Sequence, residues 1–528
     1  MYRHSKTRFS PLLKAGVGAS AYLLLSMQVA AAPGAAACNA LLTQASQLGL
    51  RSTTITGAQY LTPATGAYCE VTATVAPSHD VRIRLPDTWQ QRYLQLGGGG
   101  FDGNISNLSG PFASNGRDPV ANGYVVAGDN GGHRSAEFPG PTFAADRGLS
   151  LSYATAKIHD TTTVAKALIQ SYYGQQSKYR YFTGCSNGGK NASVAAANFA
   201  DYFDGVIGGD GVWGHADDDV GGSDMAGLTS KWARSVQTGG LPAAKGLALY
   251  RKTVEACDAL DGLSDGVVSN VRACPFAKIA EAMRCTAGDD GTCLTDADLT
   301  KVEVHTSPLM LDGRVIGAPW SASANLANVA GAGLPSGFLA LALRSPAPID
   351  PMTYDVASQF TGVAAALDGV YSMTGDLDGV VKFLRKDKKL FLYHGWEDTT
   401  VPSYVSVNFF SALQEADGQA SRNARLYMAP GVGHCAGGSG ADSIDLLSMM
   451  SRWVENNAEP GSPANPAIAW KRAPNGPAEQ SAAQFSRPLC PFPQFAFYVG
   501  RGDPAQASSY VCRPGLPAST NSFKRKAG

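Results

Sequence analysis

The feature that most limits how this chain can fold is a series of short apolar runs, most of which end in glycine-rich turns. Two runs alternate apolar and polar residues, and residues 152–174 between later runs have helical spacing, a combination typical of an α/β sheet. Polar turns at strand ends would line one edge of that sheet. The runs are residues 71–77, 81–86, 92–101, 123–132, 179–189 and 203–211.

A long segment in the middle of the chain breaks this pattern. Residues 212–386 are rich in loop signals and hold four of the cysteines, after which residues 388–402 and 424–435 restore two buried-strand patterns. We therefore predict one α/β core, residues 38–211 and 387–528, interrupted by an inserted lid domain, residues 212–386, which we call the insertion. The Pro- and Ala-rich tail after Trp470 predicts irregular structure.

Charge and the N-terminal segment limit the possible partners and the location. Lys plus Arg and Asp plus Glu both number 43, so there is no net charge to attract nucleic acid. Residues 1–37 combine a basic start, a short apolar stretch and small residues, which predicts a signal peptide and a secreted or periplasmic protein. Lipid anchoring at Cys38 is a less favoured alternative. No other stretch is long and apolar enough to span a membrane, and no feature indicates an oligomeric state.

The ten cysteines form an even set, which favours disulfides in an exported chain. The absence of a CxxC pair argues against a zinc ribbon. Their order suggests four local bridges and leaves one long-range pair, although sequence alone leaves the connectivity open. The suggested pairs are Cys38 with Cys69, Cys257 with Cys274, Cys285 with Cys293, Cys490 with Cys512, and Cys185 with Cys435.

The stretch "GCSNG", residues 184–188, fits the pattern G-x-S-x-G between a strand and a helix-like segment. This context is typical of a nucleophile elbow, in which a strained turn exposes a serine hydroxyl. An ordinary glycine turn is the alternative, because the chain has 60 glycines. The elbow predicts an α/β-hydrolase core with Ser186 as the nucleophile.

This fold places an acid and then a histidine after the serine in chain order. Glu397 and Asp398 both follow the strand that begins at residue 388, and we favour Asp398 because it lies further into the turn. His434 is the only histidine that comes after them. We therefore predict that His434 takes the proton of Ser186 and that the acid orients the imidazole.

Cys185 is a second possible nucleophile, because it directly precedes Ser186. A thiolate is improbable in an exported protein, whereas a bridge from Cys185 to Cys435 would hold the serine and histidine loops together. The oxyanion hole needs two backbone donors. We assign one to Asn187, which follows the serine, and the other to Gly99 or Gly100.

These motifs carry a family resemblance. "GCSNGG", "HGWED" and "GVGHC" are similar to motifs of the tannase and feruloyl esterase family of α/β-hydrolases, and "RPLCPFPQFAFYVGRGD" resembles its C-terminal segment. The resemblance implies a disulfide between the cysteines that adjoin the catalytic serine and histidine. It also implies a small aromatic ester as substrate, such as an ester of gallate or ferulate. The family includes mono(2-hydroxyethyl) terephthalate hydrolases, so this activity is an alternative, as is a binding protein without catalysis.

The segment "CDALDGLSDGVV", residues 257–268, which we call the acidic loop, places Asp258, Asp261 and Asp265 among turn residues. Calcium binds several oxygens at flexible spacing, but a solvated acidic turn would have the same composition. The loop is not an EF-hand, because Arg272 replaces the glutamate that the EF-hand pattern requires. The family resemblance implies a structural Ca²⁺ here, with carbonyl oxygens from Leu263 and Val267.

Overall fold

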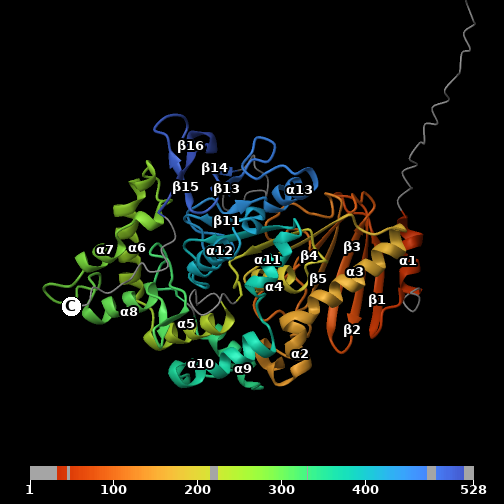
Figure 1. The fold of residues 1–528 in the computed structure, drawn as a ribbon, viewed down its shortest axis with the longest axis horizontal. Helices are drawn as coiled ribbons and strands as arrows, with labels where there is room; N and C mark the ends of the chain where they lie inside the picture. Colours follow the sequence, from red (N-terminus) through yellow and green to blue (C-terminus); the bar gives the residue numbers. More distant parts are fainter. Residues whose placement is uncertain (1–32, 44–47, 215–223, 330, 473–482, 517–528) are drawn as a thin grey trace, which may run out of the picture. The chain divides into compact units, whose positions relative to one another are not determined.

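A nine-stranded mixed sheet lies at the centre of the computed structural model, which describes residues 33–43, 48–214, 224–329, 331–472 and 483–516 (Figure 1). The strand order is β1-β2-β3-β5-β4-β6-β7-β10-β11. In chain order the strands are β1 (Thr53–Leu61), β2 (Tyr68–Val75), β3 (His79–Pro86), β4 (Arg92–Leu96), β5 (Tyr124–Asp129), β6 (Tyr179–Cys185), β7 (Gly205–Gly209), β10 (Lys389–Gly395) and β11 (Ala424–Ala429).

The sheet is antiparallel at one end and parallel over the rest. β1, β2, β3 and β5 pair antiparallel, whereas β5, β4, β6, β7, β10 and β11 pair parallel. Every predicted strand is observed. The sequence reasoning missed β1, an edge strand whose residues are mostly half-exposed and which therefore lacks a clear apolar pattern. The carboxyl ends of the parallel strands share one edge of the sheet.

Helices cover both faces of this sheet. One face packs against α1 (Gly34–Thr43), α3 (Lys157–Tyr173), α4 (Asn187–Asn198), α11 (Leu377–Arg385) and α12 (Tyr404–Ala416), and the opposite face packs against α13 (Leu446–Asn456). The predicted helix over residues 152–174 is observed as α3, preceded by α2 (Arg147–Leu151) and a π-helical segment, η3 (Ser152–Ala156).

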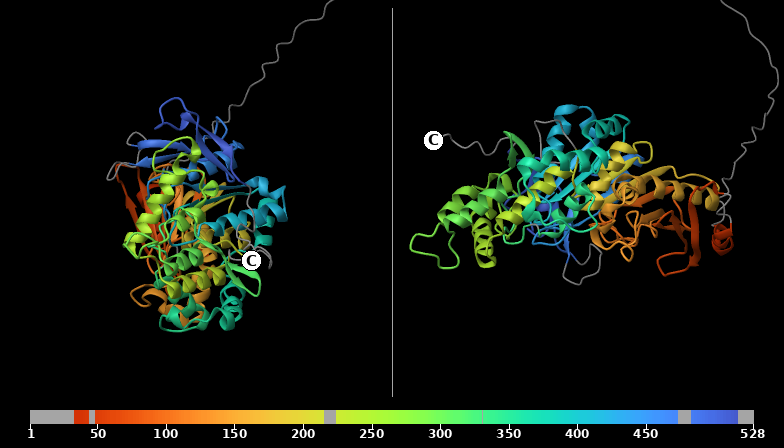
Figure 2. Two further views of the ribbon diagram at one scale, coloured as in Figure 1. Left: turned by 90° about the vertical axis from the view of Figure 1, so that its left-hand side faces the viewer. Right: turned by 90° about the horizontal axis from the view of Figure 1, so that it is seen from below.

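The insertion contains mostly helices rather than loops. Between β7 and β10 lie α5 (Met225–Thr238), α6 (Ala243–Cys257), α7 (Phe276–Ala282), α8 (Asp296–Thr306), the hairpin β8 (Leu309–Leu311) and β9 (Arg314–Gly317), α9 (Gly333–Leu343) and α10 (Val356–Ala364). They are followed by α11, which lies within residues 212–386 but packs on the core sheet. Their apolar cluster also takes in core residues such as Phe143 and Tyr153. Figure 1 and the right-hand view of Figure 2 agree that α6 to α8, drawn in green, lie away from β1 and β2.

The sequence had predicted irregular structure after Trp470, but the described residues of this tail, 471–472 and 483–516, form strands. The tail forms β14 (Ala483–Pro488), which pairs with β13 (Ile468–Arg472) next to β12 (Ser443–Ile444), and a hairpin of β15 (Gln494–Tyr498) and β16 (Tyr510–Pro514). These strands are only five or six residues long and mostly half-exposed or exposed, so the sequence shows no clear alternation of apolar and polar residues that would predict them. Packing of Ala469 and Phe485 against the core holds the three-stranded sheet in place.

Most of the predicted signal peptide lies outside the described residues. Of residues 1–37 the structure describes the last five, and Gly34 to Ala37 already belong to α1. Among the residues that the structure describes, no helix is both long and apolar enough to cross a membrane.

Candidate active site

Ser186 occupies the sharp turn between β6 and α4. Its backbone has φ 62° and ψ −121°, and residues other than glycine rarely adopt a positive φ. Strain of this kind collects at functional sites, and the Ser186 N–H is held by the Gly209 carbonyl at 2.9 Å. The predicted nucleophile elbow is therefore present in strand–turn–helix form.

The glycines around Ser186 let the start of α4 approach two strand ends. A Cβ on Gly188 would lie 2.7 Å from the Gly97 carbonyl oxygen, and one on Gly189 would lie 2.2 Å from that of Gly209. Both distances are shorter than any van der Waals contact with a Cβ. The pair of glycines after Asn187 is thus required by the close packing of α4 on the loop after β4 and on β7.

Asp398 and His434, which the sequence predicted as the acid and the base, lie in hydrogen-bond contact. Asp398 follows β10, His434 follows β11, and the Asp398 Oδ2 lies 2.7 Å from the His434 Nδ1. The other oxygen of this fully buried carboxylate accepts hydrogen bonds from the backbone of Thr400 and Val401. The carboxylate of Glu397 instead lies 3.2 Å from the Tyr250 hydroxyl, so the choice of Asp398 agrees with the geometry.

The electrostatics of this pair favour charge separation. Burial alone would raise the pKa of Asp398, but the charge of His434 and hydrogen bonds from His394 and His434 hold it well below its usual range. Burial would likewise lower the pKa of His434, yet the attraction of Asp398 outweighs burial and raises it to about 9. The buried carboxylate therefore stabilises a protonated imidazole, as a general base needs after it takes a proton.

All five suggested disulfides are present, and all ten cysteines are paired. The bridge from Cys185 to Cys435 spans 250 residues of chain with a Cα–Cα distance of 5.9 Å. It joins the residue before Ser186 to the residue after His434, so Cys185 is not a free thiol. Cys38 is bonded to Cys69, which leaves no thiol for lipid attachment in this structure.

Two buried residues that the sequence reasoning missed lie behind the acid. The His394 Nε2 is 3.3 Å from the Asp398 Oδ2 and 3.8 Å from the Asp210 Oδ1, and the His394 Nδ1 contacts the Ser406 hydroxyl at 2.8 Å. Burial raises the pKa of Asp210 to about 6. Asp210 directly follows β7, and His394 is the second-to-last residue of β10. Their position at strand ends was the available signal.

A small cavity of about 30 Å³ lies beside Ser186. Gly100, Asn187 and Lys190 form part of its wall, so of the two candidate oxyanion glycines it is Gly100 that borders this cavity. The rest of the wall is apolar, and the Trp232 and Phe338 rings stack with centroids 5.9 Å apart. The apolar lining residues are Val212, Met225, Trp232, Leu334, Phe338 and Val401.

The acidic loop partly fits a cation. The Asp258 Oδ1 is buried and has no hydrogen-bond partner among the described residues, and burial raises the pKa of Asp261 to about 6. Asp265, in contrast, pairs with Arg487. Within the described chain, the groups of three acidic, histidine or cysteine ligand atoms that lie within 4.8 Å of one another are found elsewhere. An ion here would therefore depend on carbonyl oxygens, such as those of Leu263 and Val267.

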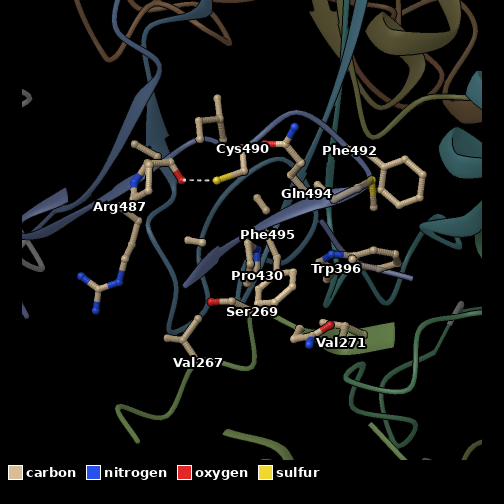
Figure 3. A pocket seen from close by; sticks show the side chains of 18 of the residues that line it. Val267, Ser269, Val271, Trp396, Pro430, Arg487, Cys490, Phe492, Gln494 and Phe495 are labelled. Carbon is tan, nitrogen blue, oxygen red and sulfur yellow. Dashed lines mark hydrogen bonds between the residues drawn. The ribbon is translucent and has the colours of Figure 1, made fainter. Parts of the chain in front are cut away.

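The acidic loop and the segment after it pack near the end of β10, which Asp398 follows. Figure 3 shows Val267, Ser269 and Val271 around a cavity that Trp396 and Phe495 also line, and this cavity has a volume of about 50 Å³. Trp396 stands two residues before Asp398. Ser186, Asp398 and His434 do not line this second cavity.

Comparison with known proteins gives one consistent family. A family model described as "Tannase and feruloyl esterase" matches residues 63–335 and 318–513. A mono(2-hydroxyethyl) terephthalate hydrolase of Piscinibacter sakaiensis is 25% identical, with 84% of each chain covered. A protein named "Probable feruloyl esterase" from Arthroderma benhamiae is 30% identical, with 82% of each covered.

Solved structures agree on the fold. Feruloyl esterase B from Aspergillus oryzae matches with a TM-score of 0.75 at 21% identity, over 90% of this chain and 99% of that one. Tannin acyl hydrolase from Aspergillus niger matches with a TM-score of 0.67 at 19% identity, over 90% of this chain and 95% of that one. The architecture is the α/β-hydrolase fold, as predicted.

The long-range disulfide should contribute more to stability than a short one. Replacing Cys185 and Cys435 by serine releases a loop of 250 residues, and the chain-entropy model assigns such a bridge about 5 kcal/mol. Replacing Cys285 and Cys293, which are eight residues apart, is the matched control and should cost about half as much. Urea unfolding measures both. Equal losses in the two double variants would contradict the special role of the long bridge.

The titration of His434 should report its contact with Asp398. We expect the His434 imidazole to titrate near 9 in the unaltered protein, because the buried carboxylate favours the protonated ring. In Asp398→Asn burial still lowers the pKa of His434 and only the charge of Asp210 still raises it, so the midpoint should fall well below 9. NMR of the imidazole measures this. Glu397→Gln should leave the titration near 9, and an unshifted midpoint in Asp398→Asn would refute the pairing.

Proposed function

This chain belongs to the tannase and feruloyl esterase family and is a carboxylic ester hydrolase, and we propose that it cleaves esters of aromatic carboxylic acids through an acyl-enzyme on Ser186. The observation that supports the mechanism best is the bridge that joins the loops of Ser186 and His434, together with the 2.7 Å contact between His434 and Asp398.

In the first half of the reaction, Ser186 Oγ attacks the ester carbonyl carbon and His434 accepts the hydroxyl proton. Asp398 stabilises the imidazolium that results. The negative charge that develops on the carbonyl oxygen is bound by the backbone N–H of Asn187, at the start of α4, and by the loop of Gly99 and Gly100. The C–O bond of the ester then breaks, and the leaving alcohol takes the proton from His434.

In the second half, a water molecule attacks the acyl-enzyme. His434 takes a proton from that water, and the same donors bind the second oxyanion. Collapse of this intermediate returns the proton to Ser186 Oγ and releases the carboxylic acid. Both halves begin with a neutral imidazole. Because the pKa of His434 is raised to about 9, the rate should increase as the pH rises towards that value.

The choice of an aromatic acid rests on the wall of the Ser186 cavity. Trp232 and Phe338 present stacked rings beside the serine, and Phe101 packs on Phe338 at 5.0 Å between centroids. Aromatic side chains favour flat apolar ligands. The relative from Piscinibacter sakaiensis supports a second candidate of the same class, the monoester of terephthalate.

We also propose that the insertion acts as a lid. Met225 and Trp232 come from α5, and Leu334 and Phe338 come from α9, so with Val212 five of the six apolar lining residues belong to the insertion. The accessible space beside Ser186 is small, about 30 Å³, and we infer that this wall moves outward to admit an aromatic acyl group.

Five disulfides support an extracytoplasmic location for the protein, because bridges of this kind persist in oxidising compartments. We further propose that the acidic loop binds a structural Ca²⁺ through Asp258 and Asp261, with Asp265 and the carbonyls of Leu263 and Val267. The unpartnered buried oxygen of Asp258 supports this. The bound ion would supply positive charge to the buried carboxylates and would take no part in the ester chemistry.

The nucleophile can be tested with a panel of esters. Ser186→Ala should lose at least about a thousandfold in kcat on every substrate, because the acyl-enzyme cannot form. Ser193→Ala removes a buried hydroxyl from the same helix and should retain hydrolysis. The panel of methyl gallate, methyl ferulate, chlorogenate and the terephthalate monoester ranks the acyl groups. Full activity of Ser186→Ala would refute the mechanism, and failure of the unaltered protein on the whole panel would refute the substrate class.

The metal can be tested without an activity assay. We expect the purified protein to contain calcium, and chelation should lower its stability by about 2.7 kcal/mol if calcium had been present at a hundred times its Kd. Asp258→Asn should give the same melting temperature with and without chelator, whereas Asp290→Asn, in an exposed loop, should still respond. Elemental analysis and thermal melts measure this. A protein that contains no calcium and does not respond to chelation would overturn the site.

A further inference from the structure

A buried ion pair lies directly behind the glycine-rich loop of the active site. The Lys157 Nζ donates to the Asp102 Oδ2 at 2.8 Å, and the two side chains are 2% and 0% exposed. Removing two charges from water is costly, and such a pair contributes little net stability compared with apolar packing. Its position beside Ser186 therefore points to a role other than stability.

Asp102 is built into the loop that supplies one oxyanion donor. Its backbone N–H donates to the Gly99 carbonyl at 2.9 Å, which closes a tight turn over Gly100 and Phe101. Its own backbone has φ 46°, in the left-handed region. Gly131 leaves room for it, because a Cβ there would lie 2.1 Å from the Asp102 Cβ. The backbone hydrogen bond to Gly99 and the close packing on Gly131 thus fix the position of Asp102 relative to the loop.

The same carboxylate contacts the side chain of Asn187, the residue whose backbone N–H is the other oxyanion donor. The Asn187 Nδ2 donates to the Asp102 Oδ1, and the Asn187 Oδ1 lies 3.1 Å from the Tyr153 hydroxyl. That hydroxyl is also 2.9 Å from the Gly100 carbonyl oxygen. Asp102 and Tyr153 together therefore hold the side-chain carboxamide of Asn187 and link it to the turn that contains Gly100.

The positive charge of Lys157 reduces the repulsion that the Asp102 carboxylate would exert on an oxyanion. A lone carboxylate behind the hole would repel the negative charge of the tetrahedral intermediate. Lys157 offsets that charge directly, and the Lys157 and Lys190 ammonium nitrogens each lie 4.7 Å from the centroid of the Tyr153 ring. Lys190 has no hydrogen-bond partner among the described side chains and backbone groups, and burial lowers its pKa well below the usual value.

We propose that Asp102 is a positioning residue, which holds the Asn187 and Gly100 peptides in the geometry of the oxyanion hole while Lys157 neutralises its charge. The inference rests on the proposed acyl-enzyme mechanism. Asp102 does not touch the ester. It acts on the reaction through the backbone donors that it orients, so its effect should fall on the transition state and not on binding of the ester.

The test is Asp102→Asn, which keeps the shape of the side chain but removes its charge. We expect kcat to fall about 10- to 100-fold with KM changed less than about twofold, since one displaced oxyanion donor costs about 100-fold or more. Phenylboronic acid, which forms a tetrahedral adduct with the serine, should bind more weakly by a similar factor. Tyr153→Phe, which removes only the hydroxyl, should show a smaller loss with the same split between kcat and KM.

The matched control is Asp298→Asn. Asp298 also forms a buried ion pair, with Lys245 at 2.6 Å, but this pair lies in the insertion. Its loss should lower the melting temperature without changing kcat. If Asp102→Asn does not fold, Tyr153→Phe alone decides. An unchanged kcat in the folded variants, or a rise in KM in place of a fall in kcat, would overturn the proposal. Ser186→Ala with full activity would instead refute the mechanism on which it rests.

Discussion

The bridge between Cys185 and Cys435 is the constraint on which the rest of the site depends. Ser186 follows β6 and His434 follows β11, and β7 and β10 lie between these strands in the sheet. Three strand spacings correspond to about 14 Å, which is far more than a hydrogen bond can span. The two loops must therefore lean toward each other over the ends of β7 and β10, and the bridge holds them in that position.

The space beneath the bridge is filled by the groups that the intervening strands supply. Asp210 follows β7 and Asp398 follows β10, and the Asp210 carboxylate contacts the Cys185 sulfur at 3.4 Å. His394 lies between the two carboxylates. Each strand end thus contributes one group to a continuous buried layer. The insertion is attached to the same layer, because Trp232 donates from its indole to the Thr400 carbonyl at 2.6 Å, next to Asp398.

Sequence reasoning reached the parts of this site that depend on local pattern and chain order. The elbow at Ser186, the position of His434 and the cysteine pairs all follow from spacing along the chain, and strands with strong apolar runs were found for the same reason. What it missed depends on contacts between distant segments. The half-exposed β1 and β14 have no strong apolar pattern, and the contact of Lys157 with Asp102 joins α3 to a loop 55 residues earlier, with no motif to mark either residue.

The order of the cysteines along the chain has a consequence for how the protein matures. Four cysteines, at positions 257, 274, 285 and 293, are synthesised after Cys185 and before its partner. Oxidation that followed the order of synthesis would pair Cys185 with Cys257, and the serine loop would then be joined to the wrong segment. Cys185 must stay reduced until residue 435 has emerged, or be released by thiol–disulfide exchange. In the second case the yield of active protein would depend on the isomerase capacity of the compartment in which the chain is oxidised.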